Sequence, residues 1–236
     1  MTTARAFWIT RPGDGEIRDV EVPAPGAEEV RVRTIVSGVS AGTERLVFTG
    51  GVPASQYAVM RAPFQEGEFP GPVKYGYAAV GVVEDGPATR LGERVFCLHP
   101  HQSAFVVPAA AAVPVPAAVP DHRAALGANM ETALNAVWDA TPAPAERVAV
   151  VGAGVVGLLT AHLLDRFGFA PTLVDVDAAR GETAAALGLA FAAPDDDRGP
   201  FDLVVHASGA PAGLVWALER LAFEGRVVEL SWYGER

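Results

Sequence analysis

The hydrophobic pattern up to about residue 107 is that of short strands. From residue 30 to 36, apolar or small residues alternate with Arg31 and Arg33, which is the period of a half-buried strand. The turn sequence Asp85-Gly86-Pro87 ends another such run. The Gly- and Pro-rich segment 50–72 is predicted to be a long loop, of a kind that is more often functional or mobile than neutral. We predict strands over residues 4–10, 17–22, 30–36, 78–84, 94–98 and 104–107.

After the Pro- and Ala-rich stretch 108–120, the pattern changes to apolar strands that alternate with helices. Asp121 is a candidate N-cap for the first helix, and Gly168 and Gly188 stand where later helices end. We predict helices over residues 123–140, 155–167, 178–187 and 211–222, and strands over residues 148–151, 172–175, 189–192, 203–206 and 226–230. Such alternation is typical of a parallel sheet covered on both faces. The predicted fold class is α/β, with a mostly-β domain over residues 1–120 followed by a doubly wound parallel sheet over residues 121–236.

The sequence Gly152-Ala153-Gly154-Val155-Val156-Gly157 carries the clearest chemistry. A bare G-x-G-x-x-G pattern is weak evidence in a chain with 25 glycines, but this one follows an apolar strand and opens an apolar helix. Gly152 permits a tight turn, Gly154 lets the backbone approach a diphosphate, and Gly157 lets the helix pack closely. The N–H groups at the helix start, including those of Val155 and Val156, suit phosphate. The motif predicts a dinucleotide site.

Asp175 indicates which dinucleotide is bound. It lies 18 residues after Gly157, at the end of the next predicted strand, where a carboxylate accepts hydrogen bonds from ribose hydroxyls. Its charge would repel a 2′-phosphate, so NAD is favoured over NADP, although the nearby Arg180 weakens that preference. The alternatives are a Rossmann-like domain that binds FAD or another nucleotide, or one that binds no ligand.

The parallel sheet is predicted to have five strands, whereas the full form of this fold has six. A missing edge strand leaves the backbone of the fifth strand unpaired. Three interpretations are open: the chain is a fragment, it is a truncated gene product, or a partner covers the edge.

Composition excludes several classes of protein. Half of the residues are apolar and 19% are charged, which is typical of a globular fold, and the net charge is −10 without a Lys/Arg cluster. Neither nucleic acid nor a membrane is therefore an expected partner. We see no signal peptide and no transmembrane span. A single cysteine, Cys97, fits a reducing compartment, so we expect a cytoplasmic protein.

The whole chain resembles the medium-chain dehydrogenase/reductase superfamily of alcohol dehydrogenase-like proteins. The order of the two halves matches, residues 91–95 (LGERV) resemble the family's G-D-R-V turn, and residues 207–209 (ASG) resemble its A-S-G. The resemblance implies a GroES-like domain over residues 1–120 that carries substrate chemistry and a Rossmann NAD-binding domain over residues 121–236. It also implies that Thr132, Ser208, Leu230 and Ser231 lie near the cofactor, and that a homodimer forms through the sheet edge.

Zinc-binding members of this superfamily carry a metal ligand set that this chain lacks. Ser40 or Ala41 stands at the first ligand position, Tyr77 at the second and Ala128 at the third, so we expect no zinc at the usual site. The segment 37–44 (SGVSAGTE) resembles a zinc-lacking branch that includes bacteriochlorophyllide dehydrogenase-like proteins. In a rival interpretation Cys97, His99 and His101 share one strand face and bind a metal. Packed side chains are the simpler explanation, because alternate strand residues are spread over roughly 7 Å.

We therefore expect a zinc-independent, NAD(H)-dependent oxidoreductase that transfers hydride to or from an alcohol, a carbonyl or an activated double bond of a small molecule. The candidate catalytic residues, which would donate or relay the proton, are Thr43, Tyr77, His101 and Glu131. Each also has an ordinary interpretation, such as an ion pair between Lys74 and Glu131. His206, at the end of a predicted strand, either binds a ribose or packs in the core. The alternative function is a non-catalytic or truncated dinucleotide-binding protein.

Overall fold

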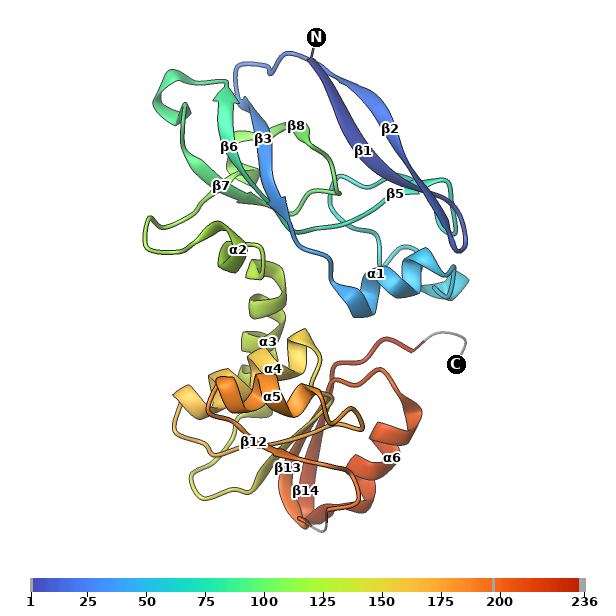
Figure 1. The fold of residues 1–236 in the computed structure, drawn as a ribbon, viewed down its shortest axis with the longest axis vertical. Coiled ribbons are helices and arrows are strands. Elements are labelled where there is room, and N and C mark those ends of the chain that lie inside the picture. The colour runs from blue at the N-terminus through green and yellow to red at the C-terminus, as the bar shows by residue number, and fades with distance from the viewer. Residues whose placement is uncertain (1, 197, 234–236) are drawn as a thin grey trace. The chain divides into compact units, whose positions relative to one another are not determined.

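The computed structural model describes residues 2–196 and 198–233, which fall into two compact units (Figure 1). The first unit contains residues 2–128 and the second residues 129–233. The domain boundary predicted between residues 120 and 121 stays a prediction, because contacts alone do not mark where an independently folding domain begins. Each unit is described by itself.

The first unit is built from two antiparallel sheets, with the orders β2-β1-β5-β4 and β8-β3-β6-β7-β9 in the described residues (Figure 1). The alternating pattern of the sequence explains the second sheet, because Val30, Val32, Val95 and Phe105 all point into one buried cluster. The strands are β1 (Thr2–Arg11), β2 (Asp14–Val22), β3 (Glu29–Ser37), β4 (Glu66–Gly67), β5 (Val73–Lys74), β6 (Ala79–Asp85), β7 (Arg94–Cys97), β8 (Ala104–Pro108) and β9 (Val113–Pro114). The six predicted strands of this half are thereby confirmed, with ends that shift by a few residues.

A helix that the sequence did not predict follows β3. This helix, α1 (Ala41–Phe48), buries only Val47 fully, and Gly42 lies in its first turn. Periodicity therefore gave no signal, and packing against the neighbouring sheet decides the conformation. The segment 50–72 contains only short elements, η1 (Ala54–Gln56), β4 and the cis prolines Pro70 and Pro72. The remaining short helices of this unit are η2 (Ala88–Arg90), η3 (Ala109–Ala111) and α2 (Asp121–Ala124).

The helix predicted over residues 123–140 is two helices. The first, α2, stops at Ala124, and α3 (Gly127–Ala140) begins three residues later. Asp121 is not the N-cap, which is Pro120; its carboxylate instead accepts a 2.6 Å contact from Arg94. The predicted cap was wrong because an ion pair across the unit competes with local capping.

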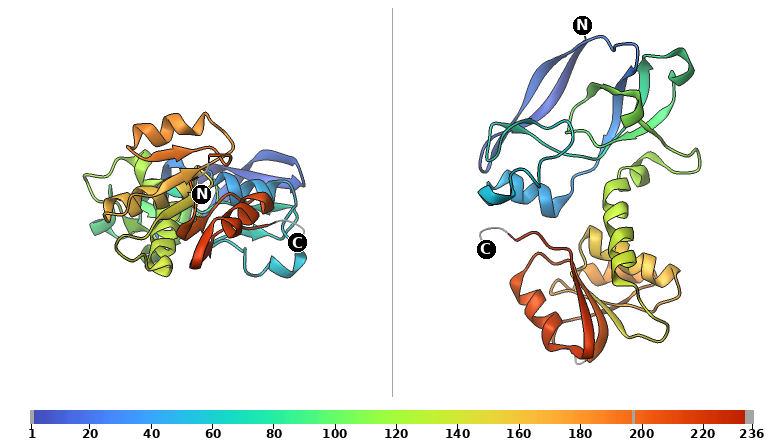
Figure 2. Two further views of the ribbon diagram at one scale, coloured as in Figure 1. Left: turned by 90° about the horizontal axis from the view of Figure 1, so that it is seen from below. Right: turned by 180° about the vertical axis from the view of Figure 1, so that it is seen from behind.

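The second unit confirms the doubly wound parallel sheet, with the described strands in the order β12-β11-β10-β13-β14. Its core lies on both faces: residues of α3, α4 and α5 share one buried cluster with the sheet, and residues of α6 share the other. Figure 2 shows these helices from two further sides. The elements are β10 (Val148–Val151), α4 (Val155–Arg166), β11 (Thr172–Val174), α5 (Arg180–Ala186), β12 (Ala190–Ala192), β13 (Phe201–His206), α6 (Pro211–Glu219) and β14 (Leu221–Glu229).

The prediction was wrong at one boundary of this unit. The helix predicted to reach residue 222 ends at Glu219, and Leu221 already pairs with Phe201 in the sheet. The apolar run at this point fits a helix or a strand equally well, so pairing with β13 decides it. Among the described residues, β14 stands at one edge of this sheet and β12 at the other.

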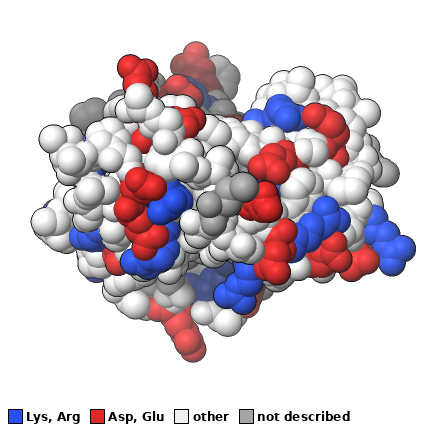
Figure 3. Space-filling model, turned by 90° about the horizontal axis from the view of Figure 1, so that it is seen from above, with Lys and Arg blue, Asp and Glu red and all other residues white. Residues whose placement is uncertain are grey.

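Charges are mixed on the surface rather than segregated. Figure 3 shows acidic and basic side chains interspersed on the face that it presents. Ion pairs such as Arg33–Glu84 and Arg31–Asp85, at 2.5 and 3.2 Å, join opposite charges on adjacent strands. Among the described residues, no helix is long and apolar enough to cross a bilayer.

Candidate functional site

The glycine motif forms a turn that only glycine can build. Gly152 has φ +103°, and a Cβ there would lie 2.7 Å from backbone atoms of Ser208. A Cβ on Gly157 would lie 1.8 Å from the carbonyl oxygen of Gly152. A Cβ on Gly154, in contrast, would meet nothing within 4 Å. Two glycines are therefore required by the turn itself, and the third leaves open space above it.

The open space lies at the start of α4. Gly154 is the N-cap of this helix, and no side chain caps it. The first N–H groups of an α-helix lack partners within the helix, and here they belong to Val155, Val156 and Gly157. Uncapped N–H groups beside an open cradle suit a diphosphate, so the residues present fit a dinucleotide.

Asp175 lies beside this turn, directly after β11. Its carboxylate accepts hydrogen bonds from the N–H groups of Ala153, at 2.6 Å, and Asp177, at 2.8 Å. Arg180 donates to the carbonyl oxygen of Ala153 at 3.0 Å and lies 4.0 Å from the Asp175 carboxylate. The structure thus brings together the glycine turn, Asp175 and Arg180, as the sequence analysis expected.

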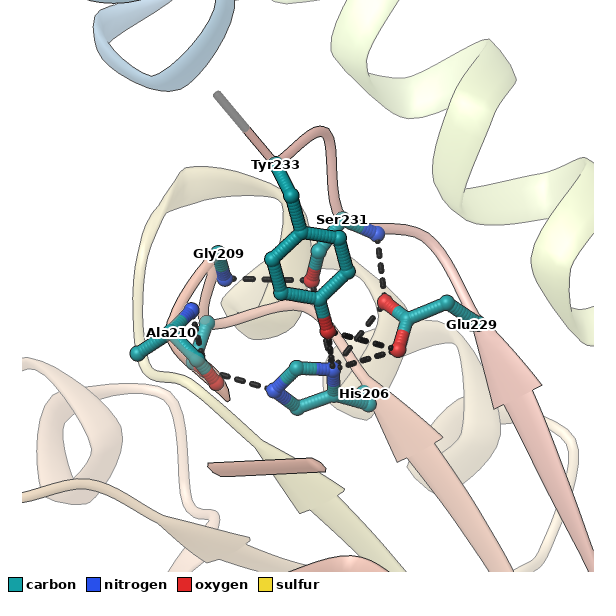
Figure 4. Close-up of polar contacts among 7 residues, drawn as sticks. His206, Gly209, Ala210, Glu229, Ser231 and Tyr233 are labelled. Carbon is teal, nitrogen blue, oxygen red and sulfur yellow. Dashed lines mark hydrogen bonds and ion pairs between the residues drawn. The ribbon is translucent and has the colours of Figure 1, made fainter. Parts of the chain in front are cut away.

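A second polar group of this unit gathers at the ends of β13 and β14 (Figure 4). His206 is fully buried. Its Nε2 lies 2.6 Å from the Ser208 hydroxyl, and its Nδ1 lies 2.8 Å from the Glu229 carboxylate. Ser231 and Tyr233 add to the group: the Ser231 hydroxyl accepts from the Gly209 N–H at 3.0 Å. Leu230, the third predicted residue here, packs against the apolar cluster under the sheet.

Glu229 supplies the carboxylate of this polar group. Burial raises the pKa of its carboxyl, but hydrogen bonds from His206, Ser231 and Tyr233 outweigh burial and hold that pKa below its ordinary value. Burial, together with the hydrogen bond to Glu229, raises the pKa of the Tyr233 phenol. Glu229 is thus ionised and Tyr233 neutral at pH 7. The sequence analysis missed Glu229, since no motif marks it, and left the role of His206 open.

In the first unit, His101 is held by two partners far away in the sequence. Its Nε2 lies 2.6 Å from the Glu44 carboxylate on α1, and its Nδ1 contacts the hydroxyl of Ser37 at the end of β3. The Glu44 carboxylate also accepts the N–H of Ser40 at 2.8 Å, which fixes its position. Gly76 makes room for the imidazole, because a Cβ there would lie 2.9 Å from the ring. Ser37 and Glu44 were not among the predicted site residues, although both lie within the segment 37–44.

The other predicted catalytic residues lie in different settings. Tyr77 is half-buried, with its ring edge-on to Tyr75 at 6.0 Å, and Thr43 is half-buried on α1. Glu131 is exposed on α3 and accepts a hydrogen bond from Asn135, and Thr132 beside it is exposed. Buried Lys74 donates to Glu66 at 2.6 Å and Gln102 at 2.5 Å within the first unit, and its suggested ion pair with Glu131 stays a prediction. Within the first unit, His101 therefore has the strongest contacts for proton chemistry.

Cys97 and His99, two of the three residues of the alternative metal site, are buried in the core. Burial raises the pKa of the Cys97 thiol to about 12, so the thiolate that a metal needs is disfavoured. His99 stacks on Phe105 at 3.8 Å and on Phe64 at 5.7 Å. In the part of the chain that the structure describes, no group of three or more His, Cys, Asp or Glu side chains could hold a metal ion.

The burial of His99 predicts an acid-sensitive fold. Burial lowers its pKa from 6.5 to about 4, with Lys74 contributing in the same direction and the carbonyl of Pro100 opposing it. The unfolded chain therefore binds this proton at a higher pH than the folded protein does, so stability falls as pH drops from about 6.5 to 4. We expect His99→Phe, which keeps the aromatic stack, to remove up to about 3 kcal/mol of this loss. Urea unfolding of the parent protein and of His99→Phe at pH 7 and 4.5 measures the loss of stability in each. An equal loss in the two proteins would contradict the role given to His99.

Comparisons with known proteins place this geometry in context. No protein-family model matches the chain. A 2-desacetyl-2-hydroxyethyl bacteriochlorophyllide A dehydrogenase from Cereibacter sphaeroides is 29% identical over 256 residues, covering 98% of this chain and 74% of that protein. The chain thus aligns with a dehydrogenase along almost its whole length.

Solved structures show the same fold. An alcohol dehydrogenase from E. coli, solved with NADH, is 21% identical with a TM-score of 0.80, and the match covers 100% of this chain and 78% of that one. A zinc-binding dehydrogenase from Sinorhizobium meliloti, bound to NADP, is 20% identical with a TM-score of 0.81 and the same coverage. These likenesses confirm a GroES-like half and a Rossmann half. Sequence and fold together support the resemblance of this chain to the medium-chain dehydrogenase/reductase superfamily of alcohol dehydrogenase-like proteins.

Proposed function

We propose that this protein is a zinc-independent oxidoreductase that uses NAD(H) to oxidise an alcohol or to reduce a carbonyl or an activated double bond. The observation that carries the proposal is the glycine turn at residues 152–157, where a Cβ is excluded at two positions and open space remains at the third. Its dehydrogenase relative supports the oxidoreductase class. The substrate is proposed to be a small molecule.

The residues around the turn have separate tasks toward the dinucleotide. The N–H groups of Val155, Val156 and Gly157 would bind the diphosphate, and the Asp175 carboxylate would accept the ribose hydroxyls. Ser208, Leu230, Ser231 and Thr132 are proposed, from the resemblance, to lie along the nicotinamide half. The cofactor supplies the hydride chemistry when bound.

His101 is proposed to handle the proton of the reaction. Its imidazole has a carboxylate partner at 2.6 Å in Glu44, which orients the ring. Tyr77, Thr43 and Glu131 remain proposed helpers with weaker support, because none has such a carboxylate partner in its described contacts.

Zinc independence rests on the chemistry of the residues at the usual ligand positions. Ser40, Ala41, Tyr77 and Ala128 provide no thiolate, imidazole or carboxylate. The residues present do not fit a catalytic zinc, so no step is assigned to one. Metal analysis of protein purified without chelators checks this, and stoichiometric zinc would overturn it.

The cellular setting is also a proposal. The single thiol, Cys97, is buried, as suits a protein of the reducing cytoplasm. A homodimer through the open edge of β14 follows from the resemblance, and sedimentation analysis tests it. Neither nucleic acid nor a membrane is a proposed partner.

Two measurements test the function. Titration of NADH followed by its fluorescence should give saturable binding, and NADH oxidation with a panel of aldehydes, ketones and enones should give turnover with at least one of them. Binding without turnover on any member would favour the non-catalytic alternative. Absence of binding to NADH and NADPH would overturn the proposal altogether.

The charge of Asp175 should set the cofactor preference. In Asp175→Asn the amide oxygen can still accept the N–H of Ala153, at 2.6 Å in the native protein, but the charge that repels a 2′-phosphate is gone. We expect the ratio of NADPH to NADH affinity to rise by about 10- to 100-fold, which corresponds to about 1.4 to 2.7 kcal/mol. Fluorescence titration with both cofactors measures the ratio. As a control, Asp177→Asn should change it far less.

A further inference from the structure

We propose that Ser208, His206 and Glu229 form a nucleophilic site that takes an acyl group from small carboxylic esters. This inference goes beyond the oxidoreductase function and does not depend on it. His206 and Glu229 lie side by side at the ends of β13 and β14 (Figure 4). The Ser208 hydroxyl lies 2.6 Å from His206 Nε2, and Glu229 lies 2.8 Å from His206 Nδ1. A serine, a histidine and a carboxylate in this order are the parts of an activated nucleophile.

The partners of His206 indicate which of its ring nitrogens donates a hydrogen bond. The Glu229 carboxylate can only accept at pH 7, so His206 donates its Nδ1–H to it and leaves Nε2 free to accept the Ser208 hydroxyl proton. Glu229 is in turn held by the Ser231 N–H at 2.7 Å and the Tyr233 hydroxyl at 3.0 Å. The carboxylate is thus fixed against the Nδ1 side of the imidazole.

Burial differs between base and nucleophile in the way that acyl transfer needs. His206 is fully buried, so water does not compete for its nitrogens, whereas Ser208 is an exposed residue whose hydroxyl oxygen also accepts the Ala210 N–H at 3.1 Å. Gly213 of α6 gives the serine its space, because a Cβ there would lie 2.4 Å from the Ser208 oxygen.

Ser208 lies in a turn that joins a strand to a helix, as the serine of a strand-turn-helix elbow does, but it is not itself among the residues with positive φ. The serine follows β13, the next residue Gly209 has φ +67°, and α6 begins at Pro211. The N–H that follows a nucleophilic serine is the one that stabilises an oxyanion in enzymes with such an elbow. Here that N–H belongs to Gly209 and donates to the Ser231 hydroxyl at 3.0 Å, a partner that can rotate away about its χ1 bond.

The reaction balances with water as the second reactant. The Ser208 oxygen bonds to the ester carbonyl carbon while its proton passes to His206 Nε2. The carbon–oxygen bond to the alcohol breaks, and the alcohol leaves with that proton. Water then adds to the acyl-serine in the same way and releases the carboxylic acid, which restores the serine hydroxyl.

The full chain, incubated with p-nitrophenyl acetate, tests the site. We expect release of p-nitrophenolate and acetylation of Ser208, located by peptide mass spectrometry. Ser208→Ala, an exposed change that leaves the core intact, should abolish the labelling. His206→Asn and Glu229→Gln should slow it, by at least about 100-fold for His206→Asn. Ser55→Ala, at an exposed serine in η1, is the matched control and should react like the parent protein.

The outcomes separate an activated serine from a merely structural one. Loss of labelling in His206→Asn, with a melting temperature close to that of the parent, supports the proposal. If His206→Asn unfolds, the conservative Glu229→Gln and a fluorophosphonate probe of the parent protein decide. Acetylation that avoids Ser208, or that reaches Ser208 equally fast in Glu229→Gln, would overturn the site.

Discussion

Replacing Gly154 by Ser should weaken NADH binding by at least about 30-fold, or about 2 kcal/mol, while leaving the protein as stable as before. A side chain at this position meets nothing within 4 Å, and the backbone of Gly154 (φ −73°, ψ −179°) is one that serine adopts readily. Serine is also a better N-cap, so unfolding should cost a few tenths of a kcal/mol more. Its hydroxyl would accept the same N–H groups that the diphosphate needs. Fluorescence titration and thermal melting measure the two effects.

Two further glycines give this prediction its controls. Gly157→Ala should damage both stability and binding, because its Cβ would lie 1.8 Å from the Gly152 carbonyl oxygen. Gly42→Ala, where a Cβ also meets nothing within 4 Å, lies on α1 and should leave NADH affinity unchanged. Unchanged NADH affinity in Gly154→Ser would show that the open space above the turn is not the diphosphate site.

The second large effect is expected at His101. His101→Asn should lower kcat by about 100- to 10,000-fold on whichever carbonyl supports turnover, because the proton then lacks its donor and acceptor. NADH affinity should stay within about twofold of the parent value, since the glycine turn is untouched. Steady-state kinetics and titration of the same preparation give both numbers.

Variants around His101 show whether the effect is chemical. Glu44→Gln keeps the side-chain volume but removes the carboxylate that orients the imidazole from 2.6 Å, so kcat should fall while NADH affinity stays close to that of the parent protein. His122→Asn, at an exposed histidine of α2, should behave like the parent protein. Full turnover in His101→Asn would show that another of the proposed residues donates or relays the proton.

Local sequence rules succeeded where the structural demand is itself local. The turn at 152–157 follows from the sizes of adjacent residues, and the five strands of the parallel sheet follow from short apolar runs. Where two local patterns competed, prediction failed: residues 221 and 222 extend β14 and not the preceding helix, and the Asp121 side chain pairs with Arg94 and does not cap. α1 had too weak a periodicity to be seen.

The residues of the candidate sites also differ in whether local sequence rules could predict them. Asp175 was predicted because its distance from the glycine turn is set by one strand and one helix. Glu44 and Glu229 were not predicted, although the carboxylate of each lies within hydrogen-bond distance of a histidine ring. Glu44 is 57 residues from its histidine in the sequence and Glu229 is 23 residues from its own. The separation of 57 residues follows no spacing rule, whereas that of 23 residues spans one helix and one strand but carries no recognised motif.

The amino-acid sequence by itself determined the α/β class, the glycine turn and the charge beside it, because each depends on residues joined by a few peptide bonds or by one regular element. Only the tertiary structure decided that His101 meets Glu44 and Ser37, and that His206 joins Ser208 to Glu229. These contacts depend on which strands pair and in which register. Pairing is a property of the whole sheet, and it is fixed by the burial of many side chains together.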